Sequence, residues 1–112
     1  MKHLIDNIRK FAKLRDWEKF HTPKNLAMAL SVEASEIVEI FQWLTEQESR
    51  NLDRDKLEAL TEEIGDVQIY LLSLADKFGI DPIEAAKKKM VINNRKYPVE
   101  KVFGDSKKYT EY

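Results

Sequence analysis

Cysteine is absent from this chain of 112 residues, and glycine and proline occur only three times each. The missing cysteine excludes a disulfide framework, a thiolate zinc site and a cysteine nucleophile. The scarcity of glycine and proline, with 35% charged residues, favours helices over a sheet joined by tight turns. The length supports one domain, residues 1–112, that is large enough to bury a core.

The sequence also lacks an excess of one charge and long apolar runs. It has 19 Lys and Arg against 20 Asp and Glu, so no long-range attraction favours nucleic acid or a membrane surface as a partner. No apolar run approaches the roughly 20 residues of a membrane-spanning helix, and the first residues lack the apolar segment of a signal peptide. We therefore expect a cytoplasmic protein that binds neither nucleic acid nor membranes.

Helical periodicity is present in four segments. The predicted helices cover about residues 3–15, 23–44, 55–78 and 82–96. Thr22-Pro23 and Asp81-Pro82 each combine an N-cap with a proline at the first helical position, and Gly79 is placed to end the third helix. Three other segments are expected to be irregular connections or a charged tail: residues 16–21, 45–54 and 99–112. The prediction is an all-α four-helix bundle.

Two pairs of acidic residues stand at i, i+3 spacing on the two central helices. They are Glu33/Glu36 and Glu63/Asp66, and the spacing puts both carboxylates of a pair on one side of the helix. Glu33 falls inside an apolar arc, where an unpaired carboxylate is costly. If the helices pack side by side, the four carboxylates repel one another unless some are protonated or a divalent ion binds. Ligands that are all oxygen favour Mg²⁺, with Mn²⁺ as a second choice. The alternative is a solvated acidic surface.

Residues suited to contact a nucleotide occur elsewhere in the chain: Trp17, Trp43, Tyr70, Asn93 and Lys96. His21, just before the Thr22 cap, fits a simple loop residue as well. Trp17 and Trp43 offer aromatic faces of the kind that stack on a nucleobase, although tryptophans at helix ends also serve a core or an interface. Asn93 and Lys96 lie on one flank of the last helix, where an amide and an ammonium group suit a bound polyanion. The alternative is a solvated helix end, at which positive charge is favoured by the helix dipole.

The third predicted helix is apolar on two sides. Its second side carries Ile69 and Leu72, and its main apolar face is formed by Leu60, Ile64, Val67, Leu71, Leu74 and Phe78. One small monomer cannot easily bury both sides, so a homodimer or a dimer of dimers (a homotetramer) is expected.

The acid pairs also carry a family resemblance. The chain contains two four-residue motifs separated by twenty-six residues: Glu33-Ala34-Ser35-Glu36 and Glu63-Ile64-Gly65-Asp66. This pattern resembles the signature of the MazG-like all-α nucleoside triphosphate pyrophosphohydrolases. The resemblance covers nearly the whole chain and is closest to the dCTP pyrophosphatase branch. Flanking segments that share it are residues 15–21, 39–43, 66–71, 93–99 and 107–110.

The resemblance implies Mg²⁺-dependent hydrolysis of dCTP, or of a related or modified pyrimidine deoxynucleoside triphosphate, to the monophosphate and pyrophosphate. It implies metal ligands at Glu33, Glu36, Glu63 and Asp66, catalysis by Glu36 with Glu33, and substrate contacts at Trp17, His21, Trp43, Tyr70, Asn93, Lys96 and Lys108. Glu36 is expected to orient or deprotonate the attacking water, while Lys96 and Lys108 neutralise the departing pyrophosphate.

Ile8 departs from the resemblance, because some dCTP-preferring members have a His at this place. Losing a base-facing polar group weakens discrimination for cytosine. The alternatives are a pyrophosphohydrolase of dUTP or of a phosphoribosyl nucleotide and, in another class, a non-catalytic helical oligomerisation module with its acids in surface ion pairs. Titration with Mg²⁺ separates these classes, because a silent module gains no thermal stability from the metal.

Overall fold

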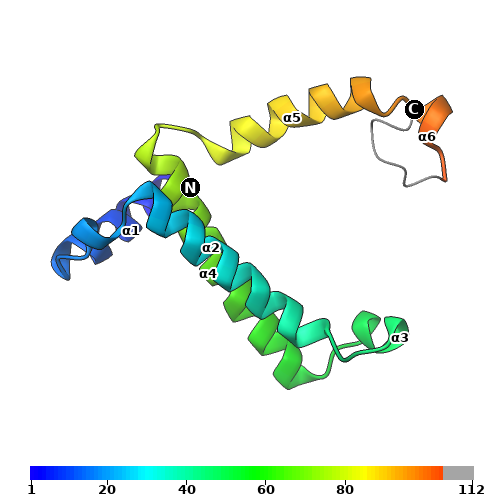
Figure 1. Cartoon of the computed structure of the whole chain (residues 1–112), viewed down its shortest axis with the longest axis horizontal. Coiled ribbons are helices and arrows are strands. Elements are labelled where there is room, and N and C mark those ends of the chain that lie inside the picture. The colour runs from blue at the N-terminus through cyan, green and yellow to red at the C-terminus, as the bar shows by residue number, and fades with distance from the viewer. Residues whose placement is uncertain (105–112) are drawn as a thin grey trace. The chain divides into compact units, whose positions relative to one another are not determined.

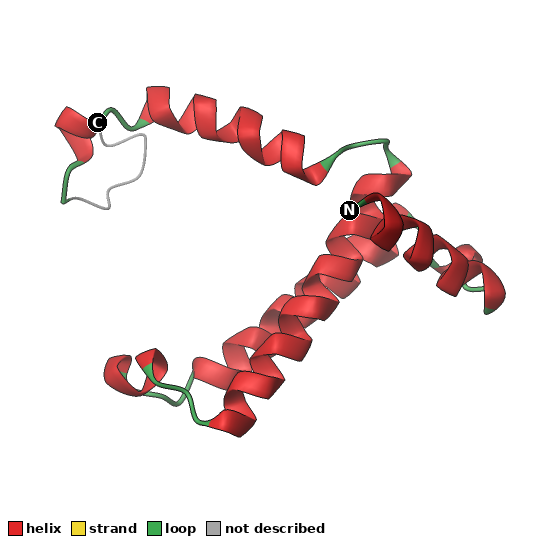
Figure 2. Ribbon diagram, turned by 180° about the vertical axis from the view of Figure 1, so that it is seen from behind, coloured by secondary structure: helices red, strands yellow, loops and turns green. Residues whose placement is uncertain are grey.

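The computed structural model describes residues 1–104, and this part of the chain is built from helices without any strand (Figures 1 and 2). The helices are α1 (Lys2–Leu14), the 3₁₀ helix η1 (Glu18–Phe20), α2 (Pro23–Phe41), α3 (Glu46–Arg50), α4 (Arg54–Lys77), α5 (Pro82–Lys96) and α6 (Val99–Val102). None of the helices in residues 1–104 has the length and apolar character needed to cross a membrane. The predicted all-α fold class is confirmed.

The helices belong to two compact units. The first unit, Met1–Gly79, contains α1 to α4, and the second, which begins at Ile80, contains α5 and α6. The grouping of all four long helices into one bundle and one domain, residues 1–112, stays a prediction from the sequence.

In the first unit, α2 and α4 run antiparallel and side by side (Figures 1 and 2). Helix α1 makes a shorter contact with α4. The buried apolar side chains come from these three helices and are Ala12, Leu26, Leu72 and Ala75. The α2/α4 pair is therefore the frame on which the candidate site is built.

The predicted starts of α2 and α5 are confirmed by their caps. The Thr22 hydroxyl accepts a hydrogen bond from the Asn25 backbone N–H at 3.2 Å, and an Asp81 carboxylate oxygen accepts one from the Ile83 N–H at 2.9 Å. These bonds satisfy backbone donors that have no partner within the helix. Gly79 has a φ of 64° just after α4, a left-handed conformation that favours glycine at this place.

The segments predicted to be irregular contain short helices. Residues 45–54 include α3, because Thr45 and Glu48 form a reciprocal capping box: the Glu48 N–H donates to the Thr45 hydroxyl, and the Thr45 N–H donates to the Glu48 carboxylate. Residues 16–21 include η1, and residues 99–102 of the predicted tail form α6. Helix α2 ends at Phe41, three residues before the predicted end.

The predicted faces of α4 are confirmed in part: Leu60, Val67 and Leu74 of the predicted main face are half-buried, whereas Ile69 of the second side is exposed. Leu72, assigned to the second apolar side, is only 2% exposed and belongs to the core of the first unit. Ile64 and Phe78 from the predicted main face are instead 49% and 62% exposed. Periodicity defines apolar stripes on a helix, but the neighbouring helices decide which stripe is buried.

Candidate metal centre

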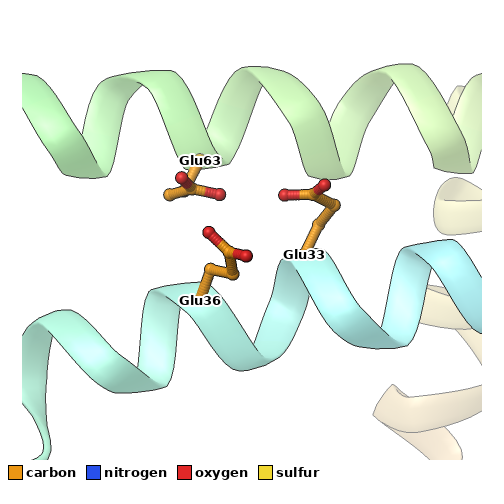
Figure 3. A group of neighbouring side chains, drawn as sticks. All are labelled: Glu33, Glu36 and Glu63. Atoms are coloured by element: carbon orange, nitrogen blue, oxygen red, sulfur yellow. The ribbon is translucent and has the colours of Figure 1, made fainter.

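Helices α2 and α4 bring three glutamates face to face. Glu33 and Glu36 lie one turn apart on α2, and Glu63 projects toward them from α4 (Figure 3). One carboxylate oxygen from each residue lies within 4.8 Å of the other two, and all three side chains are half-buried. We call these three residues the glutamate triad.

The triad concentrates negative charge in a partly desolvated place. Burial raises the pKa of Glu63, and the nearby Glu33 and Asp66 raise it further. The charge of Glu63 raises the pKa of Glu36, with partial burial and the Glu39 charge adding to the effect. Both shifts have the direction expected when like charges share a site of reduced solvation.

Nothing in the described part of the chain neutralises this charge. No ion pair between described residues includes a member of the triad. The Oε2 atom of Glu63 is buried and has no hydrogen-bond partner. A buried oxygen left without a partner costs free energy, which either protonation of the carboxyl or a bound cation would offset.

A divalent ion fits the donor set. Carboxylate oxygens are the donors that Mg²⁺ prefers, and two oxygens on opposite sides of an octahedral Mg²⁺ are about 4.2 Å apart. Three ligands of one octahedral ion also include pairs at adjacent positions, about 3.0 Å apart, so the triad oxygens, which lie within 4.8 Å of one another, would move closer together to share one ion. The three carboxylates form a group that can hold a divalent metal.

The pKa shifts predict an unusual pH dependence for the metal-free protein. A carboxyl whose folded-state pKa is raised binds its proton more tightly when folded, so its ionisation destabilises the fold. This destabilisation is present above the raised pKa and disappears as the pH falls toward the ordinary glutamate range. Glu63→Gln removes one such group, so it should raise the melting temperature at pH 7.5 more than at pH 5, measured in EDTA. An equal gain at both pH values would contradict this prediction.

Asp66, the fourth predicted ligand, lies outside the group of three oxygens. It is half-buried one turn along α4 from Glu63, and its charge contributes to the raised pKa of both Glu63 and Glu36. Its role as a metal ligand stays a prediction.

The predicted aromatic contacts fall in two places. Trp17 lies just before η1, is 43% exposed, and meets the Phe11 ring edge-on at 5.7 Å and the His21 ring at 6.3 Å. Trp43 is 86% exposed in the turn after α2. Tyr70 is half-buried on α4.

The remaining predicted contacts belong to the second unit. Asn93 and Lys96 are half-buried on α5, where the Asn93 carbonyl accepts a hydrogen bond from the Tyr97 N–H at 2.9 Å. Lys108 lies outside the described residues.

Phe11, which contacts Trp17, and Glu39, which lies near the glutamate triad, were not singled out from the sequence. Phe11 supports Trp17, and the guanidinium of Arg15 lies 3.7 Å from the centre of the Phe11 ring. Glu39 lies one turn beyond Glu36 and acts on its pKa. The i, i+3 spacing of Glu36 and Glu39 is visible in the sequence and was the available signal.

Fold and site together describe an all-α protein with a carboxylate cluster between two antiparallel helices. The model of the MazG-like family matches residues 28–112, which is most of the chain. The chain belongs to the MazG-like family.

Named relatives and a solved structure agree with this assignment. The chain is 42% identical to dCTP pyrophosphatase 1 of Homo sapiens, over 96% of this chain and 66% of that protein. It is 41% identical to dCTP pyrophosphatase 1 of Bos taurus, over 96% of this chain and 67% of that protein. The chain thus spans about two thirds of the length of these relatives.

The crystal structure of a pyrophosphatase from Archaeoglobus fulgidus has the same fold. It is 48% identical, with a TM-score of 0.83 over 88% of this chain and 92% of that one. The resemblance to the dCTP pyrophosphatase branch is confirmed.

Proposed function

We propose that this protein hydrolyses a nucleoside triphosphate, dCTP or a related or modified pyrimidine deoxynucleotide, to the monophosphate and pyrophosphate. The observation that carries the proposal is the glutamate triad, with its unpartnered, buried Glu63 oxygen. The similarity to proteins named dCTP pyrophosphatase 1 supports the substrate class. The reaction belongs to nucleotide metabolism.

Glu33, Glu36 and Glu63 would hold Mg²⁺, and Asp66 would add negative charge beside them. Mg²⁺ bound there would supply positive charge for the phosphates and lower the pKa of a water molecule. Because the three carboxylates come from two helices, metal binding should also stabilise the α2/α4 pair.

We assign to Glu36 the role of general base for the attacking water. Its half-buried carboxylate belongs to the triad, so it would lie beside water held by the ion and would be placed to accept a proton from that water. It would accept a proton as the water oxygen bonds to the α-phosphorus, and the bond from that phosphorus to the bridging oxygen of pyrophosphate would break.

The rest of the substrate would contact residues outside the triad. We assign the base to Trp17 and Trp43, because both are exposed enough to stack on it. They flank opposite ends of α2, about 27 Å apart along its axis, so the two rings that meet one base would come from different copies of the chain in the proposed oligomer. Tyr70 and His21 are assigned to the nucleoside. Positively charged or amide groups at Asn93, Lys96 and Lys108 are assigned to the phosphates.

We also propose a homodimer or homotetramer. Large apolar side chains of the α2/α4 pair are exposed, among them Val32, Val38, Ile64 and Phe78, at 49–62%. Apolar surface of this kind on a small protein favours self-association. The cytoplasmic location stays a prediction from the sequence.

A panel of nucleoside triphosphates tests the function. With Mg²⁺, we expect dCTP and related pyrimidine deoxynucleotides to release pyrophosphate and not orthophosphate, and EDTA to stop the reaction. Preferred turnover of dUTP or a phosphoribosyl nucleotide would move the assignment to those substrates. Absence of turnover together with no thermal stabilisation by Mg²⁺ would support the silent oligomerisation module instead.

A further inference from the structure

Arg9 and Asp76 form an ion pair that differs from the others in the described part of the chain. Five of the six ion pairs between described residues join side chains three or four positions apart. Arg9 on α1 instead reaches Asp76 on α4, sixty-seven positions away. Its Nε donates to Asp76 Oδ2 at 2.8 Å, and its Nη2 donates to Oδ1.

This geometry orients α1 more than it stabilises the fold. The Asp76 side chain is 24% exposed and that of Arg9 is 59% exposed, and pairs this accessible contribute little to stability. The planar guanidinium binding both carboxylate oxygens nevertheless fixes direction as well as distance. Helix α1 contacts α4 over a short stretch and buries only Ala12. Few other contacts therefore fix the angle between α1 and α4, and the Arg9–Asp76 pair contributes much of that restraint.

The C-terminus of α1 carries Trp17. The backbone N–H of Trp17 donates to the Ala12 carbonyl at 2.9 Å, and the backbone N–H of Asp16 donates to the Lys13 carbonyl at 3.1 Å. These two bonds form a Schellman motif. Asp16 has the left-handed φ of 54° that this turn requires. The Trp17 ring then meets Phe11, one residue before Ala12. Trp17 thus moves with α1.

The short helix η1, which follows Trp17, is hydrogen-bonded to α2. The side-chain amide of Asn25 donates to the Phe20 carbonyl at 3.0 Å. Arg9, Asp76 and His21 also line one hollow, which α1, η1 and α4 share. The position of Trp17 relative to His21 and α4 therefore depends on the angle at which α1 is held.

We propose that Arg9 and Asp76 are positioning residues that set Trp17 in place for the nucleotide. Asp76 and Glu63 lie on the same helix, about 20 Å apart along its axis at 1.5 Å per residue. A contact that fixes α1 on α4 consequently fixes Trp17 with respect to the triad. The inference rests on the proposed function for the role of Trp17 as a base contact.

Kinetics of Arg9→Gln and Arg9→Lys test the proposal. We expect Arg9→Gln to raise KM for the preferred triphosphate about tenfold, since a small misplacement of a binding group is costly, while kcat and the Mg²⁺-induced thermal shift stay unchanged. Arg9→Lys keeps the charge but loses the contact with both carboxylate oxygens, so it should raise KM as well.

The double variant Arg9→Asp/Asp76→Arg should restore part of the loss. Arg54→Gln, which breaks the local Arg54–Glu58 pair, is the matched control and should leave KM unchanged.

Fluorescence provides a readout that does not depend on turnover. Trp17 and Trp43 are the two tryptophans of the chain, so Trp43→Phe leaves Trp17 as the reporter. In that background, Arg9→Gln should increase acrylamide quenching of Trp17 and Arg54→Gln should not. Unchanged quenching, or an unchanged KM in Arg9→Gln, would overturn the proposal. If the wild-type protein hydrolyses no triphosphate, the proposed function fails, and the quenching result still decides whether this ion pair positions Trp17.

Discussion

Replacing Glu63 by Gln is expected to abolish the thermal stabilisation by Mg²⁺ and to lower the rate of pyrophosphate release at least about a thousandfold. Gln has nearly the same shape as Glu but brings an amide in place of the buried, unpartnered oxygen. The variant removes the only triad member on α4, so an ion held by the remaining triad carboxylates would be bound by α2 alone. Thermal melts with and without Mg²⁺, followed by the hydrolysis assay, measure both effects.

Glu62→Gln is the matched control for this substitution. Glu62 is the preceding residue on α4 and is exposed, so its loss removes the same charge without touching the triad. It should retain the Mg²⁺ response and the turnover of the wild type. An equal loss in both variants would show that overall charge, and not the triad, governs metal binding.

Glu36→Gln should lower kcat by about 10² to 10⁴, the range over which a general base contributes. Glu33 and Glu63 remain in this variant, so part of the Mg²⁺ response should persist, and kcat is best compared at saturating metal and nucleotide. The helical circular dichroism should stay that of the wild type, because the amide side chain of this variant fits the half-buried space that Glu36 occupies.

Glu39→Gln serves as the control on the same helix. Glu39 is exposed one turn beyond Glu36 and acts on it only through its charge. Its kcat should stay close to that of the wild type. Full turnover by Glu36→Gln, with unchanged circular dichroism, would assign the activation of water to another group.

The long helices could be predicted from the sequence because their ends are set locally. Thr22 and Asp81 cap the helices that follow them with side-chain hydrogen bonds to residues two or three positions away. Gly79 ends α4 through its own backbone conformation. Signals of this kind are complete within a few residues, so no tertiary information is required.

Short elements and helix orientation were harder to predict. The capping box of Thr45 and Glu48 is visible in the sequence, but the five residues of α3 are too few to show periodicity. The burial of Leu72 depends on where α1 and α2 contact α4. When a helix has apolar residues on two sides, its sequence does not show which side is buried.

The candidate site was predicted in part for the same reasons. The i, i+3 spacing predicted that Glu33 and Glu36 share one side of their helix, and in the structure this side of α2 faces Glu63 on α4 (Figure 3). The sequence singled out Glu33 as the costly acid, whereas the unpartnered buried oxygen belongs to Glu63. Which oxygen loses its solvent depends on how two helices rotate against each other. The Arg9–Asp76 pair joins distant parts of the chain and leaves no local signature.

The division of the triad between two helices has a consequence for insertions and deletions. One residue added inside α2 between Glu33 and Glu36 would turn the second carboxylate by about 100° and carry it away from α4. A residue added in the turn around Asn51 and Leu52, outside both long helices, would change the loop without changing either helical register. Length variation among homologous sequences should therefore concentrate in the connection that includes α3.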